Sequence, residues 1–255
     1  MLKYVASLLV AGVIAMGSIS AHAAGDQKHP KDMHWQFDGM FGTVDRASAQ
    51  RGLQVYREVC ASCHGLKRVA FRNLMEIGFA EGEVKTIAAD YSVQDGPNDE
   101  GEMFSRPGLP SDRFVSPFPN EKAARAANGG AYPPDLSLMV KARPDGANYL
   151  YSLMVGYEPA PSHVTLSPGQ YYNPYFPGGL LAMPPPLSDG LVTYQDGTVA
   201  STEQMSKDLV NFLQWTAEPE MEQRKRMGIK VLVFLAIMTI LFYIAKKRIW
   251  RDVSR

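Results

Sequence analysis

An uninterrupted apolar run near the C-terminus constrains this 255-residue chain more than any other feature. Residues 231–245 (VLVFLAIMTILFYIA) contain no charged side chain, and extending the run back to Met227 adds only Lys230. Those 19 residues would form a helix roughly 28 Å long at ~1.5 Å per residue, about the thickness of the hydrocarbon core of a bilayer. The sequence therefore predicts a transmembrane helix over about residues 228–245.

Positive charges flank the apolar run on both sides, so the run alone does not set its orientation. Residues 224–226 (RKR) precede it, and a basic tail with an interfacial tryptophan, Trp250, follows it. This pattern is typical of a membrane segment with anchoring side chains at both ends. The alternative is a buried helix of a soluble protein.

The N-terminus has the pattern of a secretory signal peptide. Lys3 supplies the positive start, residues 5–16 are uncharged and mostly apolar, and Ala21-His22-Ala23 has the small-x-small form of a cleavage site. An uncleaved anchor is the alternative, but the apolar part is too short to span a bilayer. We expect residues 1–23 to be removed, residues 24–222 to lie outside the cytoplasm, and residues 223–255 to form the anchor with a cytoplasmic tail.

The zero net charge conceals a separation of charge along the chain. Residues 24–222 carry 16 basic and 25 acidic side chains, whereas residues 223–255 carry 9 basic side chains and one acid. An acidic body argues against nucleic acid as a partner. It suits a cationic protein partner.

The body reads as one mainly helical domain with long irregular loops. The segment 81–102 is acidic and rich in turn residues, and 158–200 contains eight prolines without helical or strand periodicity. We expect a surface excursion at the first, an ordered loop at the second, and no strand. Capping residues and apolar spacing predict helices from Asp45 to about His64, from Asn120 to Gly129-Gly130, from Asp135, across 149–154, and from Ser201.

The pentapeptide Cys60-Ala61-Ser62-Cys63-His64 has the C-x-x-C-H pattern by which haem c is attached. On a helix the two cysteines lie one turn apart on the same side, so both sulfurs can form thioethers with the vinyl groups of one porphyrin. His64 follows at once, where its imidazole can bind the iron. Export fits this interpretation, because haem c is attached outside the cytoplasm.

Two other kinds of site use similar cysteine spacing. A thioredoxin-like redox pair needs a βαβ context, which the pattern here lacks. A structural zinc site needs four ligands, and the chain has only two cysteines. Haem c is therefore the favoured interpretation.

The sixth iron ligand decides what a haem does, because a thioether keeps the iron six-coordinate and raises its potential. Met183 lies in Gly178-Gly179-Leu180-Leu181-Ala182-Met183-Pro184-Pro185-Pro186. The three prolines fix an extended backbone after the methionine, and the glycines permit a close approach. Local sequence favours Met183 over His163 and leaves His163 as the alternative.

Taken together, these segments resemble the cytochrome c1 family, the c-type haem subunits of the cytochrome bc1 complex, in its bacterial form. The resemblance covers nearly the whole mature chain. It rests on VCASCH at 59–64, AARAANGGAYPPDLS at 123–137, KARPDGANYLYSLMVGY at 141–157, GGLLAMPPPL at 178–187, and the C-terminal anchor.

The resemblance implies a cytochrome c-like haem domain with Cys60 and Cys63 holding haem c and with His64 and Met183 as axial ligands. It also implies that Arg143 lies near a haem propionate. Three further residues would line the haem pocket: Tyr56, Asn128 and Pro134. Some bacterial relatives have an extra disulfide near the methionine loop, which this chain has no cysteines to form.

The function implied is one-electron transfer, without catalysis by this subunit alone. The Rieske iron–sulfur protein would deliver electrons from quinol oxidised in the cytochrome b subunit, and a c-type cytochrome would accept them. The complex would be a dimer in the bacterial inner membrane, in contact with lipid, with the haem domain in the periplasm. One alternative is an anchored c-type cytochrome of another oxidase or reductase. Another is a haem enzyme or sensor with an open iron site.

Overall fold

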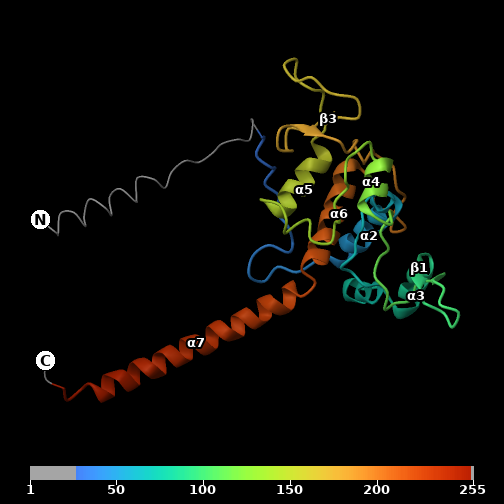
Figure 1. Ribbon diagram of the computed structural model, residues 1–255. Helices are drawn as coiled ribbons and strands as arrows, with labels where there is room; N and C mark the ends of the chain where they lie inside the picture. The colour runs from blue at the N-terminus through green and yellow to red at the C-terminus, as the bar shows by residue number, and fades with distance from the viewer. Residues whose placement is uncertain (1–26, 254–255) are drawn as a thin grey trace, which may run out of the picture.

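In the computed structural model, which describes residues 27–253, two helices form the centre of the body. Helices α2 (Arg46–Glu58) and α6 (Thr202–Ala217) pack along each other, and α5 (Gly146–Val155) packs against α6 (Figure 1). The shorter helices surround this centre: η1 (Cys60–Ser62), η2 (Phe71–Ile77), α3 (Glu81–Ala89) and α4 (Glu121–Ala127). The expected mainly α fold is confirmed, whereas the expected signal peptide lies outside the described residues.

A glycine and a buried carboxylate allow α2 and α6 to approach closely. A Cβ atom at Gly52 would lie 2.1 Å from the carbonyl oxygen of Asp208, so no larger residue fits there without displacing α6. The Asp208 carboxylate is fully buried and accepts hydrogen bonds from Ser48 Oγ at 2.7 Å and Arg51 Nε at 2.9 Å. Because a buried charge is costly unless it is paired, these contacts fix the register of the two helices.

Helix starts were predicted well, because a cap depends on neighbouring residues. Asp45, Asn120 and Ser201 each accept a backbone N–H through a side-chain oxygen at the start of α2, α4 and α6. Helix α4 ends before the Gly129-Gly130 pair, and α5 contains residues 149–154.

Two helix predictions were wrong. Helix α2 ends at Glu58 instead of continuing to His64, because the chain tightens into the 3₁₀ turn η1. No helix starts at Asp135, whose carboxylate accepts the backbone N–H groups of Lys67 at 2.8 Å and Ser137 at 3.0 Å. The carboxylate therefore joins two distant segments, and residues 136–145 form turns.

The acidic segment 81–102 is more regular than predicted, because it contains α3 and the first strand of a hairpin. The structure contains two antiparallel pairs where we expected no strand. They are β1 (Ser92–Asp95) with β2 (Phe104–Pro107), and β3 (Tyr171–Tyr172) with β4 (Leu180–Leu181). These strands are short and none of their residues is fully buried, so they lack the alternating apolar pattern that reveals a strand.

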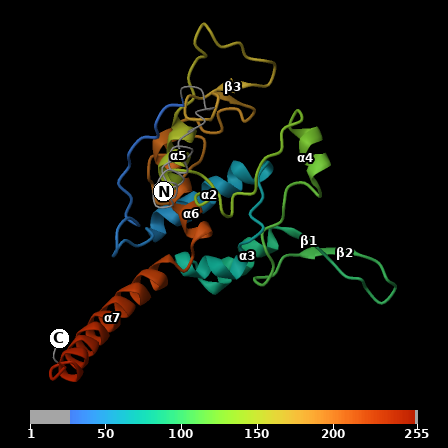
Figure 2. The ribbon, with the colours of Figure 1, turned by 60° about the vertical axis from the view of Figure 1, so that its left-hand side comes forward.

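Helix α7 (Met221–Ile249) leaves the body and extends away from it (Figures 1 and 2). Within residues 27–253 it is the one helix long and apolar enough to cross a membrane, and its apolar part makes no contact that buries it. A free-standing helix that could span a membrane is thus present where the transmembrane helix was expected.

Candidate haem-binding site

The 3₁₀ turn at the end of α2 presents both cysteines. The backbone N–H groups of Cys63 and His64 both donate to Cys60 O, at 3.1 and 2.8 Å. Residues i and i+3 lie on the same side of a 3₁₀ turn, so Cys60 and Cys63 keep the common side that an α-helix was expected to give them. Both are free thiols and half-buried, as attachment to one cofactor requires.

His64 is oriented by two contacts with other parts of the chain. Its Nδ1 lies 2.8 Å from Pro134 O, and the Tyr56 hydroxyl donates to His64 O at 3.1 Å. A proton on Nδ1 makes the first bond, which leaves the Nε2 lone pair available for a metal. Burial lowers the pKa of His64, so the imidazole is neutral at pH 7, as a ligand must be.

The structure does not support the two alternative sites, a thioredoxin-like redox pair and a structural zinc site. Burial raises the pKa of the Cys60 thiol to about 12, with a smaller contribution from Cys63, whereas a redox-active cysteine needs a lowered pKa. Among the residues described, no three His, Cys, Asp or Glu side chains gather into a group that would hold zinc.

Met183 is half-buried against the hydrophobic core and is held through its backbone. The hydroxyl of Tyr157 donates to Met183 O at 3.0 Å. Two residues upstream, Leu181 pairs with Tyr171 across the β3–β4 hairpin. The methionine loop is thus fixed by a hairpin and a tyrosine as well as by its prolines.

Sequence reasoning missed Tyr157 and Asn173 as positioning residues. Asn173 is fully buried, and its Nδ2 donates to Leu153 O at 2.8 Å while its N–H donates to Gly179 O at 2.9 Å. It therefore joins helix α5 to the loop that carries Met183. The only sequence signal for Tyr157 was its place at the end of the 141–157 segment, one of the segments that carry the family resemblance.

The remaining predicted residues have different surroundings. Asn128 ends α4, and its Nδ2 donates to Ala124 O at 2.7 Å. Arg143 is exposed, donates to Ala142 O at 3.0 Å and forms no ion pair with any described carboxylate. The alternative ligand His163 is exposed. The structure therefore joins Tyr56, His64 and Pro134 by direct contact, and it shows no contact of Asn128 or Arg143 with them.

A cavity of about 280 Å³ opens beside Cys63. Residues 116–121 form much of its wall together with Tyr132, Pro133 and Asp135. The last two flank Pro134, whose carbonyl orients His64. Two free thiols, a neutral imidazole with Nε2 available, and a thioether on a fixed loop are a donor set that fits haem c.

Comparison with known proteins agrees with this chemistry. The model of the family described as "Cytochrome C1 family" matches residues 35–253. Cytochrome c1 of Rhodospirillum rubrum is 48% identical over 266 residues, covering 97% of both chains. The protein "Cytochrome c1 1, heme protein, mitochondrial" of Arabidopsis thaliana is 50% identical over 93% of this chain and 79% of its own length. Cytochrome b/c1 of Bradyrhizobium diazoefficiens is 50% identical over 96% of this chain, which spans 39% of that longer protein.

Covalent haem c is the cofactor of the family that matches, and the two cysteines of this chain have the required spacing. The cofactor predicted from the C-x-x-C-H pattern is thus confirmed.

Proposed function

Because the chain belongs to the cytochrome c1 family, we propose that it is the electron-transfer subunit of a cytochrome bc1 complex. In this proposal the Rieske iron–sulfur protein is the electron donor and a c-type cytochrome is the acceptor. The complex also contains cytochrome b and is a dimer, and this subunit catalyses no reaction alone. The observation that carries the proposal is the neutral, oriented imidazole of His64 directly after the two cysteines.

The protein's task is to hold two iron ligands in a fixed geometry. Bound haem c supplies a one-electron iron couple. Cys60 and Cys63 anchor the macrocycle, and Pro134 O keeps Nε2 of His64 available. Tyr157 holds the backbone of Met183, whose thioether would bind the iron. Arg143, exposed and without a described carboxylate partner, is available to a propionate.

The charge distribution supports the partners and the topology. The acidic body attracts a basic cytochrome, and α7 places the body at a membrane surface. With the predicted signal peptide at the N-terminus, the body lies in the periplasm and the basic tail in the cytoplasm of a bacterial inner membrane.

A redox titration of the purified complex tests the ligand assignment. We expect Met183→Leu to lower the midpoint potential of the c-type haem strongly and to stop electron flow from quinol to cytochrome c, because a thioether ligand raises that potential. His163→Leu is the matched control and should leave both unchanged. An unaltered potential in Met183→Leu, with a fall in His163→Leu, would show that the loop supplies a different ligand.

Carbon monoxide binding separates electron transfer from the alternative of a haem enzyme or sensor. A six-coordinate iron with a held thioether should bind carbon monoxide poorly in the reduced wild type and readily in Met183→Leu. Ready binding by the wild type would favour an open iron site and contradict the proposal.

A further inference from the structure

The loop of residues 38–43 exposes two apolar side chains on the side of the body from which α7 leaves. Met40 is 55% exposed and Phe41 is 80% exposed, whereas Phe37 and Val44 at the ends of the loop are each only 6% exposed. The base of the loop is therefore packed into the core while its tip presents apolar surface outward.

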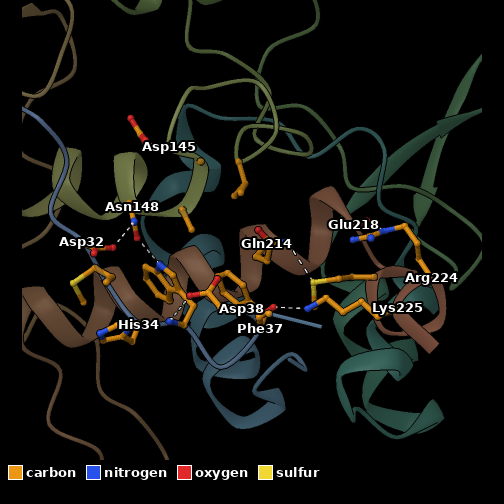
Figure 3. Close-up of a pocket in the computed structure, with 17 residues that line it drawn as sticks. Asp32, His34, Phe37, Asp38, Asp145, Asn148, Gln214, Glu218, Arg224 and Lys225 are labelled. Carbon is orange, nitrogen blue, oxygen red and sulfur yellow. Dashed lines mark hydrogen bonds and ion pairs between the residues drawn. The ribbon is translucent and has the colours of Figure 1, made fainter. Parts of the chain in front are cut away.

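The loop is attached to the first turns of α7 through a lysine. Lys225 Nζ donates to Phe37 O at 2.6 Å (Figure 3). It also donates to Gly42 O at 3.1 Å. The two carbonyls belong to residues on opposite sides of the Met40–Phe41 tip. One ammonium group thus closes the base of the loop and binds it to the helix.

A glutamate of α7 makes a second attachment next to the first. Glu222 Oε1 accepts the backbone N–H of Val44 at 3.0 Å and Arg46 Nη1 at 2.9 Å. Arg46 Nη2 also donates to Glu222 Oε2 at 3.1 Å. Bidentate pairing of this kind fixes geometry as well as distance, so the loop cannot slide along the helix axis.

These attachments place the loop at the depth of lipid headgroups. Lys225 precedes Gly228, where the expected span of residues 228–245 begins, by three residues. At ~1.5 Å per residue that separation is about 4.5 Å along the axis. Each polar layer of a bilayer is roughly 5–7 Å thick, from a total thickness of ~40–45 Å around a ~30 Å core. Lys225 would therefore lie within this layer.

We propose that Met40 and Phe41 insert into the boundary between headgroups and acyl chains, so that the 38–43 loop is a second membrane contact of this subunit. Its neighbours suit this role, because the side chains of Arg224 and Arg226, which pair with Glu218 and Glu222, remain more than half exposed and can reach lipid phosphates. An apolar tip flanked by cationic residues is the usual composition of an interfacial membrane contact.

Lipid fits this surface better than a protein partner. The surface area that two consecutive apolar side chains can bury is far less than the ~800 Å² that each partner buries in a stable protein interface. The tip also lies beside α7, whose apolar surface is exposed on every face and which the bilayer covers. The expected span of α7 begins three residues after Lys225, so the bilayer surface would lie close to this point.

The second contact would fix how the body sits on the membrane. One inserted helix leaves the body free to tilt relative to the bilayer plane, and α7 is joined to α6 by only three residues, Glu218-Pro219-Glu220. A second point of insertion restricts that tilt. The haem domain then keeps one orientation relative to the bilayer.

Depth-dependent fluorescence quenching of the full chain in its complex tests the proposal. The introduced thiol of Phe41→Cys would carry an environment-sensitive dye, with the complex reconstituted in vesicles of phosphatidylcholine and phosphatidylglycerol. The native cysteines are held as thioethers, and wild-type complex treated in the same way gives the background. Phe234→Cys, inside the apolar run, is the positive control.

Val199→Cys is the matched negative control, because Val199 is also 80% exposed. It lies just before α6, whose 16 residues place it about 24 Å along the helix from the start of α7. Met40→Cys gives an independent second position on the loop tip.

We expect lipids with a quencher near the glycerol backbone to reduce emission at positions 40 and 41 at least about twofold, and lipids with a deep quencher to act less. Emission at position 199 should not change. If lipid quenchers leave the emission at position 41 unchanged, as at position 199, the proposal is overturned. A blue-shifted dye at position 41 that no lipid quenches would also overturn it, because another subunit would then cover the loop. Loss of quenching at position 234 would instead show that α7 does not span the bilayer.

Discussion

Removing one hydroxyl group from Tyr157 tests whether the methionine loop is held for the sake of the iron ligand. Tyr157→Phe deletes the hydrogen bond to Met183 O, a contact of 3.0 Å, and leaves the ring in place. A hydrogen bond of this kind contributes about 0.5–1.5 kcal/mol. If all of that free energy serves to hold the methionine on the iron, the equilibrium for its displacement shifts by about twofold to about thirteenfold.

The measurement is the apparent affinity of the oxidised complex for added imidazole, which competes with the thioether for the iron. The expected change is a Kd lower by that factor in Tyr157→Phe. Burial raises the pKa of Tyr157 well above its usual range, so the hydroxyl stays protonated and the difference should not vary between about pH 6 and pH 9.

Tyr171→Phe is the matched control. Tyr171 lies in the same loop region, on β3, but the residue is 38% exposed, and no hydrogen bond joins its hydroxyl to a described residue. An equal change in imidazole affinity in both variants would refute the reasoning, as would an unchanged affinity in Tyr157→Phe. A lower melting temperature without a change in affinity would show that the tyrosine only stabilises the fold.

Three further predictions concern stability and association. Asp208→Asn should destabilise the body by about 3 kcal/mol, near the lower end for breaking a buried ion pair, because Arg51 keeps its contact with Asp196; thermal unfolding of the complex measures this. Hydrogen bonding to Arg46 lowers the pKa of Glu222 below 4.5, so the stability from this pair is present above that pH and is lost as the pH falls through the lowered pKa. Wild type should accordingly lose more thermal stability than Arg46→Leu on acidification from pH 6 to pH 3, and parallel losses would contradict this. Reduction of a basic cytochrome c should slow as ionic strength rises above about 0.1 M, where the Debye length is ~10 Å, and a rate flat in salt would show that the acidic body does not attract its acceptor.

The sequence by itself determined the features that depend on neighbouring residues. The spacing of Cys60, Cys63 and His64 names the cofactor, the apolar run gives the membrane helix, and the caps of α2, α4 and α6 follow from single side chains next to them. Each is a local property, so it is readable before any packing is known.

Contacts between distant segments decided the rest. Asp135 accepts the backbone N–H of Lys67 instead of starting a helix, and no local sequence pattern predicts this distant partner. The carbonyl that orients His64 comes from Pro134, 70 residues away, and the hydroxyl that holds Met183 comes from Tyr157, 26 residues away. The sequence can supply the iron ligands, but only the tertiary structure brings together the groups that set their orientation, since a hydrogen bond depends on position in space rather than on distance along the chain.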